Sequence, residues 1–137
     1  EKHFEAVDFD TDFDYLKKKI ENGADYVVTQ MFFDNRKYFE FVNRCRAAGI
    51  TVPIIPGLKP LSTKKQLDIL PRIFYLHMPE DFVKAVENCE NDAQAKQAGI
   101  EWCVQQCREL IEFGVPVLHF YTMGKSDNIY KIASQLF

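Results

Sequence analysis

Long hydrophobic runs are missing from this 137-residue sequence, and none approaches the roughly 20 apolar residues of a membrane-spanning helix. The first residues are polar and lack the basic segment and apolar core of a secretion signal. Positive charge is not in excess, because the net charge is -3 and the isoelectric point is about 5.6. These absences predict a cytoplasmic protein that binds neither membranes nor nucleic acid. The abrupt polar start also suggests a segment of a longer chain.

Paired cysteines and nucleophile motifs are missing as well. The four cysteines, Cys45, Cys89, Cys103 and Cys107, include no C-x-x-C pair with metal-binding spacing. Cys103 and Cys107 share a helix face, which favours core filling in a reducing compartment. The sequence contains no G-x-S-x-G, no Walker loop and no G-x-G-x-x-G. We therefore expect no metal site, no nucleophile triad and no Rossmann-type nucleotide site.

What the sequence does contain is enough apolar material for one domain with a core, with 47% hydrophobic and 14% aromatic residues. Its most informative stretch is the apolar run 26–34, bounded by Gly23 and Asp34. This run predicts a parallel strand buried on both faces. Gln30 is the anomaly within it, because a buried carboxamide must find hydrogen-bond partners. Gln30 is either a satisfied core amide or a group that reads a ligand at the carboxyl end of its strand.

Strand and helix patterns alternate along the chain. Strands are expected near residues 25–31, 52–56 and 116–121. Helices are expected where a capping residue precedes an apolar stripe, and many end at glycine. The predicted helices run from Thr11 to Gly23, from Asp34 to Gly49, onward from Ser62 or Thr63, from Pro79 toward Val86, from about Asp92 to Phe113, and from Ser126 or Asp127 to Leu136.

This alternation predicts an α/β fold with parallel strands and right-handed crossovers. Two architectures fit it: a small doubly wound sheet, or part of a (β/α)₈ TIM barrel, which needs about 250 residues. Three strands alone would leave long apolar edges unpaired, which favours the partial barrel and predicts self-association of the isolated chain. Residues 1–137 are then one segment of a larger barrel domain.

Three motifs carry a family resemblance. They are Thr29-Gln30-Met31-Phe32-Phe33-Asp34, then Ile54-Ile55-Pro56-Gly57-Leu58-Lys59-Pro60, then His119-Phe120-Tyr121-Thr122-Met123. In this order and spacing they resemble the C-terminal half of the catalytic barrel of methylenetetrahydrofolate reductase, over essentially the whole chain. The resemblance implies a flavin-containing TIM barrel that reduces 5,10-methylenetetrahydrofolate to 5-methyltetrahydrofolate, a step of one-carbon metabolism and methionine biosynthesis. Electrons would come from NADH or NADPH through FAD, and a homo-oligomer is expected.

The resemblance also implies roles for individual residues. Gln30, Gln66 and Lys125 fall at folate contacts, with lysine at position 125 where many relatives have arginine. Leu70 lies where an aromatic ring can pack on the folate. No catalytic residue is expected in this segment, because the family's acidic residues lie in the other half of the barrel. The FAD contacts fall at His3, Ala6, Asp12, Tyr15, Lys18 and Lys19, with Tyr15 replacing an asparagine of some relatives.

Plainer interpretations exist for several of these residues. The run Lys17–Lys19 is also typical of a solvated helix face. His119 lies within a predicted strand, and we interpret it as a core histidine rather than a ligand. A second function, a non-catalytic α/β module that binds a ligand or a partner protein, fits the composition equally well. Flavin colour in the purified full-length protein would separate the two functions.

Overall fold

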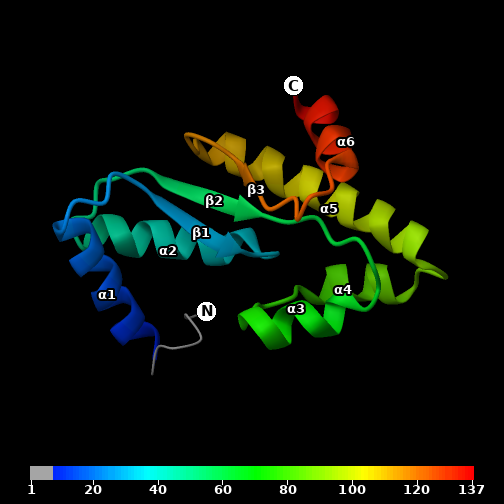
Figure 1. Ribbon diagram of the computed structural model, residues 1–137, viewed down its shortest axis with the longest axis horizontal. Helices are drawn as coiled ribbons and strands as arrows, with labels where there is room; N and C mark the ends of the chain where they lie inside the picture. Colours follow the sequence, from blue (N-terminus) through cyan, green and yellow to red (C-terminus); the bar gives the residue numbers. More distant parts are fainter. Residues whose placement is uncertain (1–7) are drawn as a thin grey trace.

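Three parallel strands form the centre of the computed structural model, which describes residues 8–137 (Figure 1). The strand order is β1-β2-β3, and both neighbouring pairs are parallel. In the register, Val28 lies opposite Ile55 and Gly57 lies opposite His119. The predicted α/β fold with parallel strands is confirmed. The strand bounds are Val27–Met31 for β1, Ile54–Leu58 for β2 and His119–Phe120 for β3.

Helices precede, separate and follow the strands. Asp34 accepts a hydrogen bond from the backbone N–H of Arg36 at 3.0 Å and caps the second helix, as predicted. The long fifth helix begins at Asp92 and ends at Phe113, where Gly114 takes a left-handed φ of 93°. The helices are α1 (Phe9–Glu21), α2 (Asn35–Ala47), α3 (Gln66–Phe74), α4 (Glu80–Glu87), α5 (Asp92–Phe113) and α6 (Asp127–Leu136).

Two predicted helix starts are wrong. The cap of α1 is Asp8 rather than Thr11, and the Asp8 carboxylate accepts the Thr11 N–H at 2.7 Å. An acid three residues upstream therefore takes the role that the threonine was expected to play. The third helix begins only at Gln66, without a side-chain cap, because residues 63–65 form a turn first.

One face of the sheet packs against helices and forms the first of two hydrophobic clusters. This face lies against α2 and α5, which run beside the strands (Figure 1). The cluster includes buried side chains from β2, α2 and α5, namely Ile54, Leu58, Val42, Cys45, Cys107 and Leu110. The second cluster joins the carboxyl end of β1 to α4 and α5, where the rings of Phe33, Phe82 and Trp102 stack with centroid separations of 5.5 and 4.8 Å.

The other face of the sheet is only partly covered by residues 8–137. Val28 is 37% exposed, and Gln30 and His119 are exposed as well. The prediction that the first strand is buried on both faces is therefore wrong, as is the interpretation of His119 as a core residue. The reason is that the buried cluster with α2 and α5 covers the opposite face of the sheet, whereas residues 8–137 cover the face of Val28 and His119 only in part.

A close contact between the strands positions their carboxyl ends. The Tyr121 hydroxyl donates to the carbonyl oxygen of Thr29 at 2.9 Å, so its ring crosses β2 at Gly57. A Cβ atom at Gly57 would lie 2.3 Å from the Thr29 carbonyl oxygen and 2.7 Å from the Tyr121 ring. The Gly57 N–H donates to the Thr29 hydroxyl at 3.0 Å, where the β1–β2 register is irregular. Only glycine fits this crossing.

Candidate functional site

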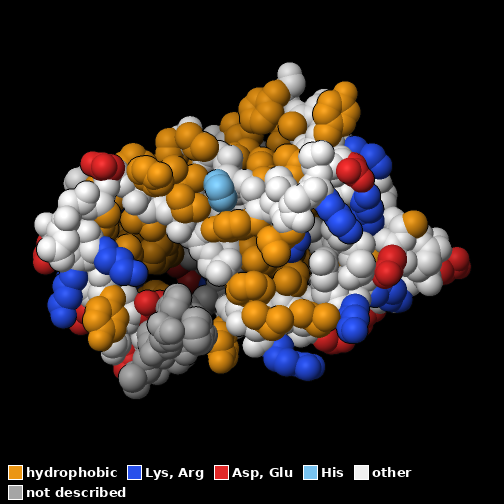
Figure 2. Space-filling model, viewed as in Figure 1, with side chains coloured by type: hydrophobic (Ala, Val, Ile, Leu, Met, Phe, Trp, Pro, Cys, Tyr) orange, Lys and Arg blue, Asp and Glu red, His pale blue; other side chains and the backbone are white. Residues whose placement is uncertain are grey.

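A groove of about 760 Å³ runs along the free side of β1. Its walls are α1, α2 and the segment Ile73–Leu76 that ends α3. Hydrophobic side chains gather over the strands on the viewed face, with a hollow beside them (Figure 2). Groove-lining residues that bear on ligand binding include Asp12, Lys19, Val28, Gln30 and Tyr75.

Gln30 lies in this groove and is not a core amide. Its side chain is exposed, and Oε1 accepts a hydrogen bond from the N–H of Met31 at 3.0 Å. The amide nitrogen makes no hydrogen bond to residues 8–137, so both of its protons are available to a ligand. This contradicts the core interpretation and leaves the ligand-reading role as a prediction.

The predicted FAD contacts are only partly brought together. Asp12 and Lys19 of α1 line the groove together with Gln30. Lys18 instead lies over the ring of Tyr15, with Nζ 5.5 Å from the ring centroid, and both of these side chains are exposed. His3 and Ala6 lie outside the described residues.

An arginine of α2 adds polar and ring contacts to the apolar packing between α1 and α2. The guanidinium of Arg44 lies 4.5 Å from the ring centroid of Phe9 and 4.4 Å from that of Phe13. It also forms an ion pair with Asp10 at 2.5 Å. These contacts fix the helix that brings Asp12 and Lys19 to the groove.

The predicted folate contacts lie on the segments that follow β2 and β3, with Gln66 as the first residue of α3 and Lys125 in the turn before α6. The Gln66 Oε1 accepts the N–H of Ser62 at 2.7 Å, and the Asn128 amide donates to the Ser62 hydroxyl at 3.1 Å. Lys125 is exposed in the turn just before α6, where its N–H donates to the Thr122 carbonyl at 3.0 Å. Neither Gln66 nor Lys125 lines the groove beside β1. The groove that contains Gln30 therefore does not include the other two predicted folate contacts.

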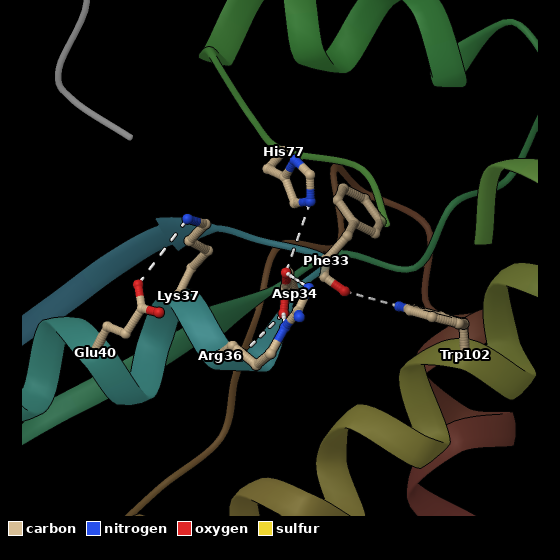
Figure 3. A network of polar contacts seen from close by, with 7 residues as sticks. All are labelled: Phe33, Asp34, Arg36, Lys37, Glu40, His77 and Trp102. Carbon is tan, nitrogen blue, oxygen red and sulfur yellow. Dashed lines mark hydrogen bonds and ion pairs between the residues drawn. The ribbon is translucent and has the colours of Figure 1, made fainter. Parts of the chain in front are cut away.

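A network that sequence reasoning missed anchors the end of β1 (Figure 3). Asp34 is buried, and Arg36 donates to both of its carboxylate oxygens, at 3.0 and 2.8 Å. These hydrogen bonds hold the pKa of Asp34 below its usual range. His77, from the loop between α3 and α4, places Nε2 3.7 Å from the same carboxylate. The loop that carries Tyr75 into the groove is thereby tied to the start of α2.

Two further polar bridges join α5 to the chain leaving β1. The indole N–H of Trp102 donates to the Phe33 carbonyl at 3.0 Å (Figure 3). The buried Gln106 amide donates to the Phe32 carbonyl and to the Asn35 side chain, both at 3.2 Å. Polar residues at buried positions of an apolar stripe are the signal that could have revealed this pair.

Metal and membrane signals are not found in the described chain. No group of three or more His, Cys, Asp or Glu side chains within residues 8–137 is arranged to hold a metal ion. Across the same residues, no helix is both long enough and apolar enough to cross a membrane.

Comparison with known proteins assigns the chain to a family. The family described as methylenetetrahydrofolate reductase matches residues 1–137. A Caenorhabditis elegans protein named probable methylenetetrahydrofolate reductase (NADPH) is 35% identical over 98% of this chain and 20% of its own length. An Arabidopsis thaliana protein named methylenetetrahydrofolate reductase (NADH) 1 is 36% identical over 93% of this chain and 22% of its own length.

A bacterial relative has a similar sequence identity to this chain, and the match covers a larger share of that relative's own length. The 5,10-methylenetetrahydrofolate reductase of Salmonella typhimurium is 34% identical over 99% of this chain and 46% of its own length. The chain thus spans between a fifth and a half of the length of these relatives. The resemblance predicted from the three motifs is confirmed, and the chain belongs to the methylenetetrahydrofolate reductase family.

Proposed function

We propose that the chain is the C-terminal half of the catalytic barrel of a reductase that converts 5,10-methylenetetrahydrofolate to 5-methyltetrahydrofolate. Electrons pass from NADH or NADPH through FAD. The observation that carries this proposal is the family match over the whole chain, combined with an accessible amide, Gln30, at the carboxyl end of β1. In parallel α/β proteins this end of the sheet is where ligands bind.

The open side of the sheet supports the partial (β/α)₈ barrel. The sheet order β1-β2-β3 leaves β1 and β3 each with a single neighbour among the described strands. The sheet face that carries Val28 and His119 is exposed, although it also includes apolar residues of β1 and β2. A closed barrel would pair both edges and bury this face with side chains of the other strands. Residues 1–137 then form one segment of a single barrel domain that acts in the cytoplasm as a homo-oligomer.

The groove beside β1 fits part of a flavin. Its walls are largely apolar, as a planar ring system requires, and Asp12 and Lys19 supply charged groups at α1. In this proposal Lys19 and Lys18 attract the pyrophosphate, Asp12 accepts hydrogen bonds, and His3, Ala6 and Tyr15 complete the contacts. FAD supplies the hydride-transfer chemistry when it is bound, and the chain binds and orients it.

On the substrate side, the Gln30 amide can both donate to and accept from the edge of a pterin. Gln66, at the start of α3, and Lys125, in the turn before α6, would contact the rest of the folate. No residue of this segment is proposed to act as an acid or base on the substrate. The residues of this chain therefore set affinity and orientation.

The proposal is tested on the purified full-length protein. The expected result is a bound flavin with absorbance near its usual visible maxima, bleached by NADH or NADPH and recoloured by methylenetetrahydrofolate. Bleaching by only one nicotinamide would also identify the electron donor. A colourless, folded protein that neither binds FAD nor oxidises either nicotinamide would contradict the proposal and favour the non-catalytic module.

A further inference from the structure

Strand β1 is irregular at the residue that carries the candidate ligand-binding amide. The register pairs on either side of the irregularity are Val28–Ile55 and Met31–Gly57. Two residues of β1, Thr29 and Gln30, therefore stand against one residue of β2, Pro56. Two residues opposite one is the arrangement of a β-bulge, which bends a strand, re-aims its side chains and is frequent next to active sites.

Both peptide groups that flank the Gln30 Cα are held by side chains. The carbonyl oxygen of Thr29 accepts the Tyr121 hydroxyl at 2.9 Å. The carbonyl oxygen of Gln30 accepts the Thr29 hydroxyl at 2.9 Å, and the same hydroxyl accepts the Gly57 N–H at 3.0 Å. Because each peptide group is planar, fixing both of them fixes φ and ψ of Gln30. These contacts therefore set the direction in which the Gln30 side chain leaves the strand.

Tyr121 is the member of this set that comes from a distant part of the chain. It follows β3, and its ring passes over Gly57 of β2, where a Cβ atom would lie 2.7 Å from the ring. Its N–H donates to the Leu58 carbonyl at 2.8 Å, and its ring meets that of His119 edge to face with centroids 4.8 Å apart. Burial raises the pKa of the Tyr121 hydroxyl, which therefore keeps its proton and remains a donor to β1.

The Gln30 side chain is tied to the same segment. Its Oε1 accepts the N–H of Met31 at 3.0 Å, so the position of the amide depends on the backbone of the bulge. A side chain that is already held in its binding orientation loses less conformational freedom when a ligand binds. A hydrogen bond that keeps the bulge in place thus supports binding by Gln30.

We propose that Tyr121 is a positioning residue, which orients the Gln30 amide toward the pterin by holding the Thr29 carbonyl across β2. The inference rests on the proposed function, and it adds a residue to which the family resemblance gives no role. Tyr121 acts through Gln30 and not on the reacting atoms.

The test is a double-mutant cycle in the full-length, flavin-loaded protein, with kcat/KM for methylenetetrahydrofolate as the readout. Tyr121→Phe keeps the ring and removes the hydroxyl that bonds to Thr29. We expect it to lower kcat/KM roughly 2- to 12-fold with the flavin content unchanged. The factor lost on Gln30→Ala should be at least about 2-fold smaller in the Tyr121→Phe background than in the wild type, because the amide is no longer held in place.

Tyr38→Phe is the matched control. The Tyr38 hydroxyl donates to the Ile54 carbonyl at 2.6 Å, at the opposite end of β2 from the bulge. This variant also takes a tyrosine hydroxyl away from a strand carbonyl, so urea unfolding should show a loss of stability comparable to that of Tyr121→Phe. The factor lost on Gln30→Ala should nevertheless be the same in the Tyr38→Phe background as in the wild type.

The outcomes separate the inference from the proposed function. An unchanged kcat/KM in Tyr121→Phe, an undiminished Gln30→Ala factor in that background, or an equal reduction of this factor in the Tyr38→Phe background would each overturn the inference and leave the proposed function standing. A full-length wild type that does not reduce the folate, or in which Gln30→Ala has no effect, would contradict both.

Discussion

Neutralising Asp34 should destabilise the protein at neutral pH and have little effect in acid. Asp34→Asn keeps a side-chain oxygen that can cap α2 but removes the charge that receives two hydrogen bonds from Arg36. A hydrogen bond to a charged group is worth about 1.5–3 kcal/mol, and the value here is smaller because the Arg36 side chain is 76% exposed. We therefore expect a loss of about 1–2 kcal/mol in the free energy of unfolding at pH 7.

The pH dependence follows from the direction of the pKa shift. The folded pKa of Asp34 lies below the ordinary value of 3.8, so the unfolded chain binds the proton more readily. The stabilisation is then present above about pH 3.8 and is lost as the pH falls through the lower, folded pKa. Wild-type and variant stabilities should converge in that acid range.

The measurement is urea unfolding followed by circular dichroism at pH 7 and at several values below pH 4. Glu80→Gln is the matched control, because Glu80 is 89% exposed and, among residues 8–137, pairs only with Lys84 on the same helix. It should change stability by less than about 0.5 kcal/mol. An Asp34→Asn variant as stable as the wild type at pH 7, or one whose deficit persists unchanged in acid, would refute the reasoning.

Two other substitutions test the packing around the site. Ala24 lies in the tight turn between α1 and β1, where its N–H donates to the Lys19 carbonyl at 3.2 Å. Ala24→Val should push α1 away from the sheet at a cost of about 1–3 kcal/mol, and in the full-length enzyme it should weaken FAD retention more than folate binding. Equal loss of both in flavin-release and folate-binding assays would show that this turn does not position the flavin. Gly57→Ala should cost at least about 1–3 kcal/mol in urea unfolding, because its Cβ would clash with the Thr29 carbonyl; unchanged stability would contradict the Tyr121 crossing.

Local signals predicted most of the secondary structure. The helix Asp92–Phe113 matched its predicted bounds because a capping residue, Asn91, precedes it and Gly114 follows it in a left-handed conformation. The parallel pairing of the strands followed from helices long enough to cross over between them. The start of α1 was missed because Asp8 and Thr11 are both good caps, and sequence alone does not rank them.

Features that depend on distant segments were not predictable in the same way. The exposure of one face of β1 depends on which distant segments pack over that face, and a continuous apolar run carries no such information. The contact between His77 and Asp34 joins the segment between α3 and α4 to the segment between β1 and α2. For the candidate site, the sequence pointed to Gln30 through its place at a strand end, whereas the hydrogen bond from Asn128 to Ser62 joins residues 66 positions apart and has no local signal.

The central claim is that the accessible Gln30 amide hydrogen-bonds to the pterin ring of a folate in a flavin-dependent reductase. The direct measurement is the kinetics of Gln30→Ala in the full-length enzyme, with the bound flavin quantified by absorbance. Loss of one neutral hydrogen bond is worth about 0.5–1.5 kcal/mol, so kcat/KM for methylenetetrahydrofolate should fall roughly 2- to 12-fold with flavin content unchanged.

Gln105→Ala serves as the matched control, because Gln105 is an exposed glutamine of α5 whose side chain, within the described residues, bonds only to Glu109 at 3.0 Å. It should leave both kcat/KM and the flavin content as they are in the wild type. A Gln30→Ala enzyme with wild-type kcat/KM for the folate, or one that loses its flavin before it loses folate affinity, would contradict the account.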